Sequence, residues 1–351
     1  MRYKLFGNTG LRVSELSLGT MTFGKGWGWG SSPDESRRVF DAYVEAGGNF
    51  FDTANMYTGG DSEKILGEFI AANRDQYVIA TKCTLTMNPA DPNAGGNHRK
   101  NLTSAVNASL TRLDTDYIDI LWLHSWDFLT PVEETMRVLD DLVRSGKIQY
   151  VGVSNVPAWY LAKANMLAEL RGWTAFAGIQ INYSLIERSS EREMLLYVDS
   201  HGLLTTAWSP LGGGMLTGKY GTGTDRREPE GMRHSEEGPF RDFSLTDRNF
   251  EIAGTVKAVA DELGCSMAQV ALAWLLHKND NIVPIIGARE VRQLEDNLAS
   301  VKISLSADQM QRLSDVSAPV PEYPGAFWAA VGPASLYGET LDKIDFRDRP
   351  Y

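Results

Sequence analysis

Short apolar segments alternate along the chain with longer segments of mixed polarity. The apolar segments are rich in Val, Ile, Leu, Tyr and Phe, which is typical of buried strands, and the longer segments have the length of helices. One of these opens with Ser32-Pro33-Asp34-Glu35, a capping serine followed by a proline and two acids that suit a first helical turn. Strands that alternate with helices favour a parallel sheet. We expect the strands near residues 15–18, 49–52, 77–81, 117–123, 148–153, 178–182, 203–208 and 282–286.

Eight strands with intervening helices fit either a closed barrel or an open doubly wound sheet. An open sheet that binds a dinucleotide should carry G-x-G-x-x-G after an early strand, and no expected strand is followed by that motif. Residues 3–13 predict a β-hairpin with its turn at Gly7-Asn8-Thr9-Gly10, which would plug the bottom of a barrel. The expected fold is therefore α/β, a (β/α)8 TIM barrel with an N-terminal hairpin plug. The aperiodic stretch 212–242 is expected to be a long loop on the catalytic face.

Composition changes this picture little. The chain has 351 residues, 43% hydrophobic and 23% charged, which is ordinary for a globular protein. Length alone suggests about two domains, but α/β barrels commonly exceed ~250 residues as one unit. We expect a single barrel domain over residues 1–351, with 319–351 as a C-terminal tail.

Charge and cysteine usage narrow the possible partners. A net charge of −11 argues against nucleic acid and anionic membranes, because both require clustered basic side chains. The two cysteines, Cys83 and Cys265, are far apart and suggest neither a disulfide scaffold nor a zinc site. The N-terminus lacks the apolar region of a signal peptide, and no later stretch is apolar over ~18 residues. We expect a cytoplasmic protein without a nucleic-acid or membrane partner, and leave its oligomeric state open.

Polar residues close nearly every expected strand. The C-terminal strand ends of a (β/α)8 barrel converge on one mouth, so these residues would share one pocket. Any strand must end in something polar, and one such residue would be uninformative; seven successive strand ends are harder to explain that way. The residues are Asp52, Lys82, His124, Ser154 with Asn155, Gln180 with Asn182, Ser209, and Gly287 with Arg289.

Four of the mouth residues could move a proton. Hydride addition to a carbonyl builds negative charge on oxygen, and Tyr57 could supply the neutralising proton. The ordinary pKa of tyrosine is about 10, so a phenolate needs a nearby cation, which Lys82 provides. Asp52 would keep Lys82 charged, and His124 could orient the carbonyl or relay the proton.

These residues and their surroundings resemble the aldo-keto reductase family, in which Asp52, Tyr57, Lys82 and His124 would form the catalytic tetrad. The resemblance runs from residue 4 to residue 315, with the motifs in the family's order. The matching segments are Phe51-Asp52-Thr53-Ala54-Asn55-Met56-Tyr57, Ala80-Thr81-Lys82, Asp119-Ile120-Leu121-Trp122-Leu123-His124, Gly146-Lys147-Ile148, Gly152-Val153-Ser154-Asn155, Gln180-Ile181-Asn182-Tyr183-Ser184, Trp208-Ser209-Pro210-Leu211-Gly212-Gly213-Gly214 and Ile286-Gly287-Ala288-Arg289.

The resemblance implies NADPH bound in extended form, with its nicotinamide in the barrel mouth and no metal. Side-chain amides and Ser154 would hold the carboxamide, Trp208 would stack on the ring, and glycine backbone would approach the pyrophosphate. Arg289, ahead of a helix expected near Glu290, favours NADPH over NADH. The expected cofactor residues are Gly19, Thr20, Met21, Asp52, Ser154, Asn155, Gln180, Trp208, Ser209, Pro210, Leu211, Gly213, Lys219, Gly287, Arg289, Gln293, Asp296 and Asn297.

The expected function is reversible, NADPH-dependent reduction of a small-molecule aldehyde or ketone. Trp27, Trp29, Trp126 and Phe128 follow the first and fourth strands, and either wall the substrate pocket or pack in the core. Two other classes stay open. One is an NADP(H)-binding, redox-sensing regulatory subunit with little turnover, and the other is an unrelated barrel lyase or isomerase with a phosphate site near strands seven and eight.

Overall fold

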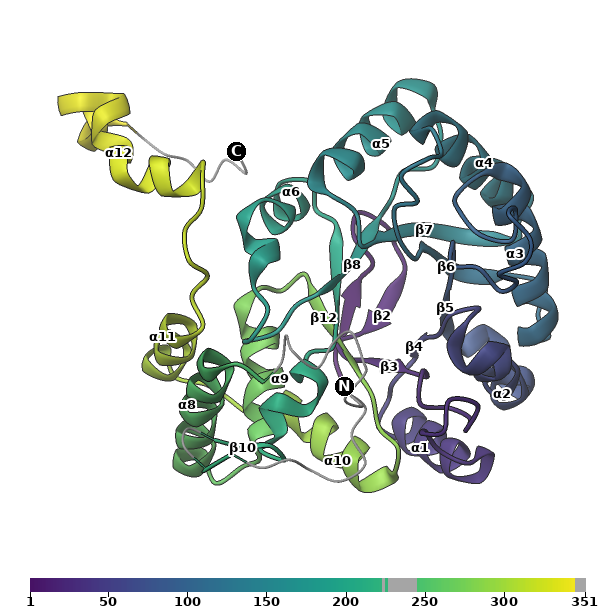
Figure 1. Ribbon diagram of the computed structural model, residues 1–351, viewed down its shortest axis with the longest axis horizontal. Coiled ribbons are helices and arrows are strands. Elements are labelled where there is room, and N and C mark those ends of the chain that lie inside the picture. Colours follow the sequence, from purple (N-terminus) through teal and green to yellow (C-terminus); the bar gives the residue numbers. More distant parts are fainter. Residues whose placement is uncertain (223–224, 227–244, 345–351) are drawn as a thin grey trace.

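Eight parallel strands close into a barrel at the centre of the computed structural model, which describes residues 1–222, 225–226 and 245–344 (Figure 1). Going around the barrel, the hydrogen-bonded order is β12-β3-β4-β5-β6-β7-β8-β9. The expected (β/α)8 barrel is therefore confirmed. Its strands are β3 (Ser17–Gly19), β4 (Phe50–Asp52), β5 (Val78–Cys83), β6 (Ile118–Leu123), β7 (Ile148–Ser154), β8 (Gly178–Asn182), β9 (Leu204–Trp208) and β12 (Ile282–Ile286).

Helices surround the barrel and cover its outer face (Figure 1). Ser32 caps the first of them, accepting a hydrogen bond from the Glu35 amide at 3.3 Å, as its sequence predicts. The α-helices are α1 (Pro33–Glu45), α2 (Asp61–Ile70), α3 (Arg99–Leu113), α4 (Val132–Arg144), α5 (Ala158–Arg171), α6 (Met194–Ser200), α8 (Asp247–Leu263), α9 (Met267–Lys278), α10 (Val291–Ala299), α11 (Ala307–Val316) and α12 (Gly325–Tyr337). The 3-10 turns are η1 (Tyr57–Gly60), η2 (Ala71–Gln76), η3 (Ser189–Arg192), η4 (Gly212–Thr217), η5 (Ser300–Lys302) and η6 (Gly338–Lys343).

The N-terminal hairpin closes the bottom of the barrel. Its strands β1 (Tyr3–Leu5) and β2 (Arg12–Ser14) pair antiparallel, and Phe6 at the turn is fully buried, 5.8 Å from the ring of Trp122. Two glycines make room for these rings: a Cβ on Gly152 would lie 2.2 Å from Trp122, and one on Gly178 would lie 2.9 Å from Phe6. The hairpin plug expected from the sequence is thus present and packed into the barrel interior.

Two expectations about segment boundaries need correction. The first barrel strand begins at Ser17 rather than at Glu15, whose carboxylate is drawn back to the backbone amide and guanidinium of Arg2. The stretch 212–242 is not wholly irregular, because it starts with η4 and continues into a small hairpin of β10 (Gly221–Thr222) and β11 (Asp225–Arg226). Residues 223–224 and 227–242 of this stretch lie outside the described residues.

The C-terminal segment leaves the barrel after α11. Figure 1 shows α12 standing outside the ring of helices, beyond α6 and α11, rather than over the barrel interior. In the part of the chain that the structure describes, no single helix has the length and apolar character to cross a membrane; α8 and α9 meet those requirements only as a pair bent by 97°.

Candidate active site

A buried lysine lies at the centre of the group expected to transfer protons. Lys82 in β5 donates hydrogen bonds to the carbonyl of Thr53 at 2.7 Å, to the hydroxyl of Tyr57 at 3.1 Å, and to the carboxylate of Asp52. The parallel register of β4 and β5 sets Asp52 beside Ala80, two residues before Lys82. A lysine ammonium has three donors, and all three are used here, so the ammonium is held in one place.

Burial and ion pairing shift the pKa of Lys82 in opposite directions. Burial by itself lowers the pKa of Lys82, but the Asp52 carboxylate and Tyr57 outweigh it and raise the pKa above its usual value. Lys82 and Asp52 are 1% and 3% exposed, so solvent screens their attraction weakly. The amine therefore stays protonated at neutral pH and places its positive charge 3.1 Å from the Tyr57 oxygen.

His124 follows β6 and faces the tyrosine. Its ring centroid lies 6.2 Å from that of Tyr57, with the two planes at 82°. Burial, and next the nearby Lys82 charge, lower the pKa of His124 to about 3. The imidazole is therefore neutral near neutral pH. Of the two roles expected from the sequence, orienting a carbonyl fits this state and carrying a proton as a cation does not.

The residues expected to hold a carboxamide lie next to the proton-transfer group. Asn155 donates from its side chain to the backbone carbonyl of His124 and to the Ser154 hydroxyl, both at 2.9 Å. Gln180 donates to the second carboxylate oxygen of Asp52 at 2.8 Å. Strands β7 and β8 thus present Ser154, Asn155 and Gln180 at the same barrel mouth as the tetrad.

Backbone strain is concentrated around this mouth. Among the described residues, six that are not glycine have positive φ, and five of these are in loops that follow barrel strands. Such conformations cost free energy and tend to persist where a precise geometry is required. The five are Thr58, Thr84, Phe128, Asn155 and Ser209.

Two observations fit a nicotinamide dinucleotide at the mouth. Nε1 of Trp208 and Nδ1 of His124 are buried without a hydrogen-bond partner, which favours a further group bound there. Gly213 and Gly214 have φ of 63° and 95°, and a Cβ on Gly214 would lie 2.4 Å from Cε of Lys219. The lysine side chain thus packs directly on bare glycine backbone, an arrangement suited to a phosphate.

Only some of the residues expected to bind the outer part of the cofactor lie together. Asn297 donates to the carbonyl of Gly287 at 3.2 Å, and Gln293 accepts from the amide of Arg289 at 2.9 Å, so these residues form one cluster at the start of α10. Asp296 points elsewhere: its carboxylate accepts from Ser266 at 2.9 Å and from Gln269 at 2.7 Å, at the start of α9.

The remaining expected cofactor residues lie in the floor and wall of the mouth. The Thr20 hydroxyl is buried against Ser62 at 2.9 Å, and a Cβ on Gly19 would lie 2.8 Å from Ile285, so both positions are tightly packed. Met21 is half-buried. Pro210 and Leu211 belong to the turn in which the amide of Gly212 donates to the carbonyl of Ser209 at 2.8 Å.

Aromatic rings surround the entrance. Trp27 lies 5.7 Å from Trp29 and 6.2 Å from the Tyr57 ring, while Trp126 lies 4.4 Å from Phe128. These contacts place Trp27 beside the proposed acid. Sequence reasoning did not single out Trp159, which lies 5.4 Å from Trp126, because its place on the following helix carries no local signal.

Thr84 is a second residue that the sequence did not reveal. Its hydroxyl accepts a hydrogen bond from the His124 amide at 3.2 Å and donates to Asn97 at 2.6 Å. Its φ of 98° is rare for a β-branched residue, and nothing in the sequence marks such a conformation.

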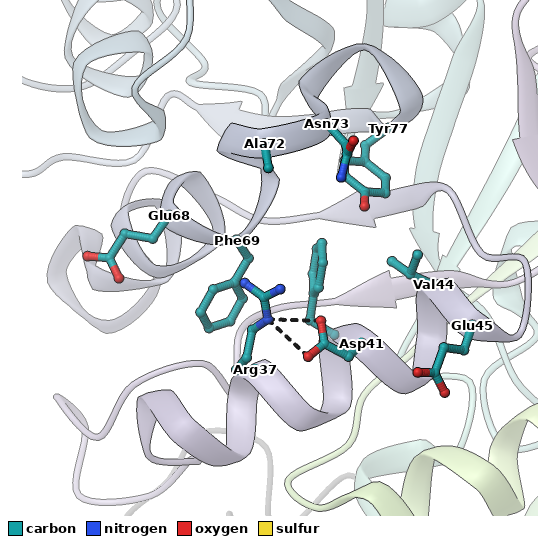
Figure 2. A pocket seen from close by; sticks show the side chains of 10 residues that line it. Arg37, Asp41, Val44, Glu45, Glu68, Phe69, Ala72, Asn73 and Tyr77 are labelled. Atoms are coloured by element: carbon teal, nitrogen blue, oxygen red, sulfur yellow. Dashed lines mark hydrogen bonds and ion pairs between the residues drawn. The ribbon is translucent and has the colours of Figure 1, made fainter.

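A separate hollow of about 310 Å³ lies on the outer side of the barrel between α1 and η2 (Figure 2). Arg37 crosses it, paired with Asp41 at 2.8 Å and lying over the ring of Phe69. No tetrad or expected cofactor residue lines it. The described residues also contain no group of three or more His, Cys, Asp or Glu that could hold a metal ion.

Comparisons with known proteins point to one family. The profile of the "Aldo/keto reductase family" matches residues 15–318. The norsolorinic acid reductase stcV of Emericella nidulans is 40% identical over 316 residues, covering 87% of this chain and 79% of that protein. The aryl-alcohol dehydrogenase [NADP(+)] of Phanerodontia chrysosporium is 35% identical over 347 residues, covering 93% and 88%.

Proposed function

The chain belongs to the aldo/keto reductase family and is an NADP-dependent oxidoreductase, and from that premise we propose that it reduces aromatic aldehydes or ketones to alcohols, with Tyr57 as the proton donor. The observation that carries this proposal is the hydrogen bond from the buried Lys82 ammonium to the Tyr57 hydroxyl, with Asp52 behind the lysine.

The chemistry of the proton follows from this arrangement. When bound, NADPH supplies the hydride. As negative charge develops on the substrate oxygen, Tyr57 donates its proton to that oxygen, and the Lys82 ammonium stabilises the phenolate left behind. Neutral His124 donates a hydrogen bond to the same oxygen and fixes the direction of the carbonyl. Asp52 supplies the balancing charge, so the lysine keeps its proton throughout.

The aromatic substrate class has two independent supports. Trp27 presents its ring beside Tyr57, and it is 37% exposed, so a flat substrate could lie against it while its carbonyl reaches the hydroxyl. Two relatives are named for their action on norsolorinic acid and on aryl alcohols.

NADPH is favoured over NADH in this proposal because of Arg289. Arg289 follows β12 and lies just before α10, where its positive charge would attract a phosphate. Trp208 and the amides of Asn155 and Gln180 would hold the nicotinamide end, and Gly213, Gly214 and Lys219 the pyrophosphate.

Reduction of benzaldehyde and naphthaldehyde, followed by nicotinamide absorbance, tests this function. Tyr57→Phe should lower turnover by about 10²- to 10⁴-fold, the usual contribution of a general acid, while NADPH still quenches tryptophan fluorescence. Tyr3→Phe, at the opposite end of the barrel, is the matched control and should be unchanged. Wild-type protein that binds NADPH without turnover of any carbonyl would instead favour a redox-sensing role, and normal turnover by Tyr57→Phe would remove the tyrosine from its assigned role.

A further inference from the structure

The side chain of Gln180 crosses the centre of the barrel. It comes from β8, and its amide donates to Oδ2 of Asp52, which ends β4, at 2.8 Å. Three strands separate β4 from β8 in either direction around the barrel, so the two strands are diametrically opposite. Both side chains are buried, at 2% and 3% exposed, which makes this hydrogen bond to a charged group a strong one.

With this bond, both oxygens of the Asp52 carboxylate accept a hydrogen bond. Oδ1 of Asp52 accepts from Lys82, and Oδ2 accepts from Gln180, so the carboxylate plane is fixed from both sides. The Lys82 ammonium then bridges the fixed carboxylate and the Tyr57 hydroxyl. Hydrogen bonds therefore connect Gln180, through Asp52 and Lys82, to the Tyr57 hydroxyl.

The same bond decides which end of the Gln180 amide faces the mouth. An ionised carboxylate only accepts hydrogen bonds, so the NH2 group of Gln180 must face Asp52 and the carbonyl oxygen must face away. That oxygen makes no hydrogen bond to another described residue. It is an acceptor that a carboxamide NH2 group would satisfy.

We propose that Gln180 is a positioning residue that sets the acid strength of Tyr57 through Asp52 and Lys82, and that it links this setting to the carboxamide of the bound cofactor. The second half rests on the proposed function. Without the Gln180 donor, the Asp52 carboxylate carries more of its charge toward Lys82 and draws the ammonium away from the phenol. The phenolate of Tyr57 then loses stabilisation and forms at higher pH.

Spectroscopic titration of the cofactor-free protein tests the first half without any turnover. The chain has 13 tyrosines, so the ultraviolet titration of each protein is subtracted from that of its Tyr57→Phe counterpart to isolate Tyr57. Gln180→Met should move this titration upward by about one pH unit, the scale of one hydrogen bond to a charged group. Gln180→Glu, which adds a like charge beside Asp52, should move it further. An unmoved titration in both variants overturns the proposal, whether or not the protein reduces carbonyls.

Turnover at saturating NADPH tests the link to the cofactor. Gln180→Met should lower kcat by about tenfold and shift the alkaline limb of its pH profile upward. Ser154→Ala is the comparison, because it removes an expected carboxamide contact that does not reach Asp52. This variant should weaken NADPH binding and leave the alkaline limb of the kcat profile at the same pH. If Gln180→Met instead behaves like Ser154→Ala, Gln180 is a cofactor contact only and the proposal fails. Absence of turnover in the wild type contradicts the proposed function and leaves the titration result to decide the role of Gln180.

Discussion

The ammonium nitrogen of Lys82 lies 3.1 Å from the hydroxyl oxygen of Tyr57, although the two residues belong to different segments of the barrel. Lys82 is within β5, and Tyr57 begins the 3-10 turn that follows β4. A buried cation that touches both a phenol and a carboxylate affects folding and chemistry at once, and the two effects can be measured separately.

Lys82→Met should destabilise the protein and remove turnover. It leaves the Asp52 carboxylate buried without its counter-ion, which typically costs about 3–5 kcal/mol, measured by urea unfolding. Lys257→Met breaks the exposed pair with Asp261 and should cost less than about 1 kcal/mol. Adding Asp52→Asn to Lys82→Met should restore much of the stability and none of the turnover. Equal decreases in the free energy of unfolding for Lys82→Met and Lys257→Met would contradict a strong buried ion pair.

The neutral state of His124 predicts a specific loss of stability in acid. The pKa of His124 falls from its ordinary 6.5 to about 3 on folding, so between these values the unfolded chain binds a proton that the folded chain does not. This contribution to stability is present above pH 6.5 and is lost as the pH falls. From pH 7 to pH 5 the wild type should lose about 2 kcal/mol more than His124→Gln, by urea unfolding at each pH. If the free energy of unfolding falls equally in the wild type and in His124→Gln between pH 7 and pH 5, the pKa of His124 is not lowered by folding.

Arg289→Ala should weaken NADPH binding more than NADH binding. One charged hydrogen bond to the extra phosphate corresponds to about a tenfold change in Kd, whereas NADH has no phosphate there. Fluorescence titration with both cofactors measures this. Arg292→Ala removes the same charge from the same helix end, at a side chain 88% exposed, and should leave both Kd values within about twofold. Similar weakening of both cofactors by Arg289→Ala would argue against a phosphate contact.

Trp27→Ala should raise KM for aromatic carbonyls by up to about tenfold, because it removes one ring face at the entrance. The KM for hexanal, which has no ring to stack, should change much less. Trp328→Ala, on α12 outside the barrel, is the control and should behave as the wild type. An equal rise in KM for hexanal and naphthaldehyde would show that Trp27 shapes the pocket without selecting rings.

Sequence periodicity predicted the barrel well because its strands are continuous apolar segments. The limits of β8 and β12 agree with the expected 178–182 and 282–286. The first strand was placed two residues early, because Arg2 binds Glu15 and keeps it in the hairpin. The contact between Arg2 and Glu15 joins two segments across a turn, and the pattern of hydrophobic residues does not predict such a contact.

Residue spacing along the helix did not predict the position of every side chain at the outer cofactor site. Helical geometry does put Gln293, Asp296 and Asn297 on one face of α10. The carboxylate of Asp296 nevertheless turns to Ser266 and Gln269, which precede it by about one helix and one strand. Which of several polar neighbours a side chain selects depends on tertiary packing, and so does the positive φ of Thr84.

The plug formed by Phe6 and the N-terminal hairpin gives the barrel a sealed floor. A molecule that binds at Tyr57 would therefore enter and leave by the opposite end of the barrel, where Trp27 lies beside Tyr57. In the proposed reaction the alcohol and the spent dinucleotide would therefore both leave through that single opening, so one can obstruct the release of the other.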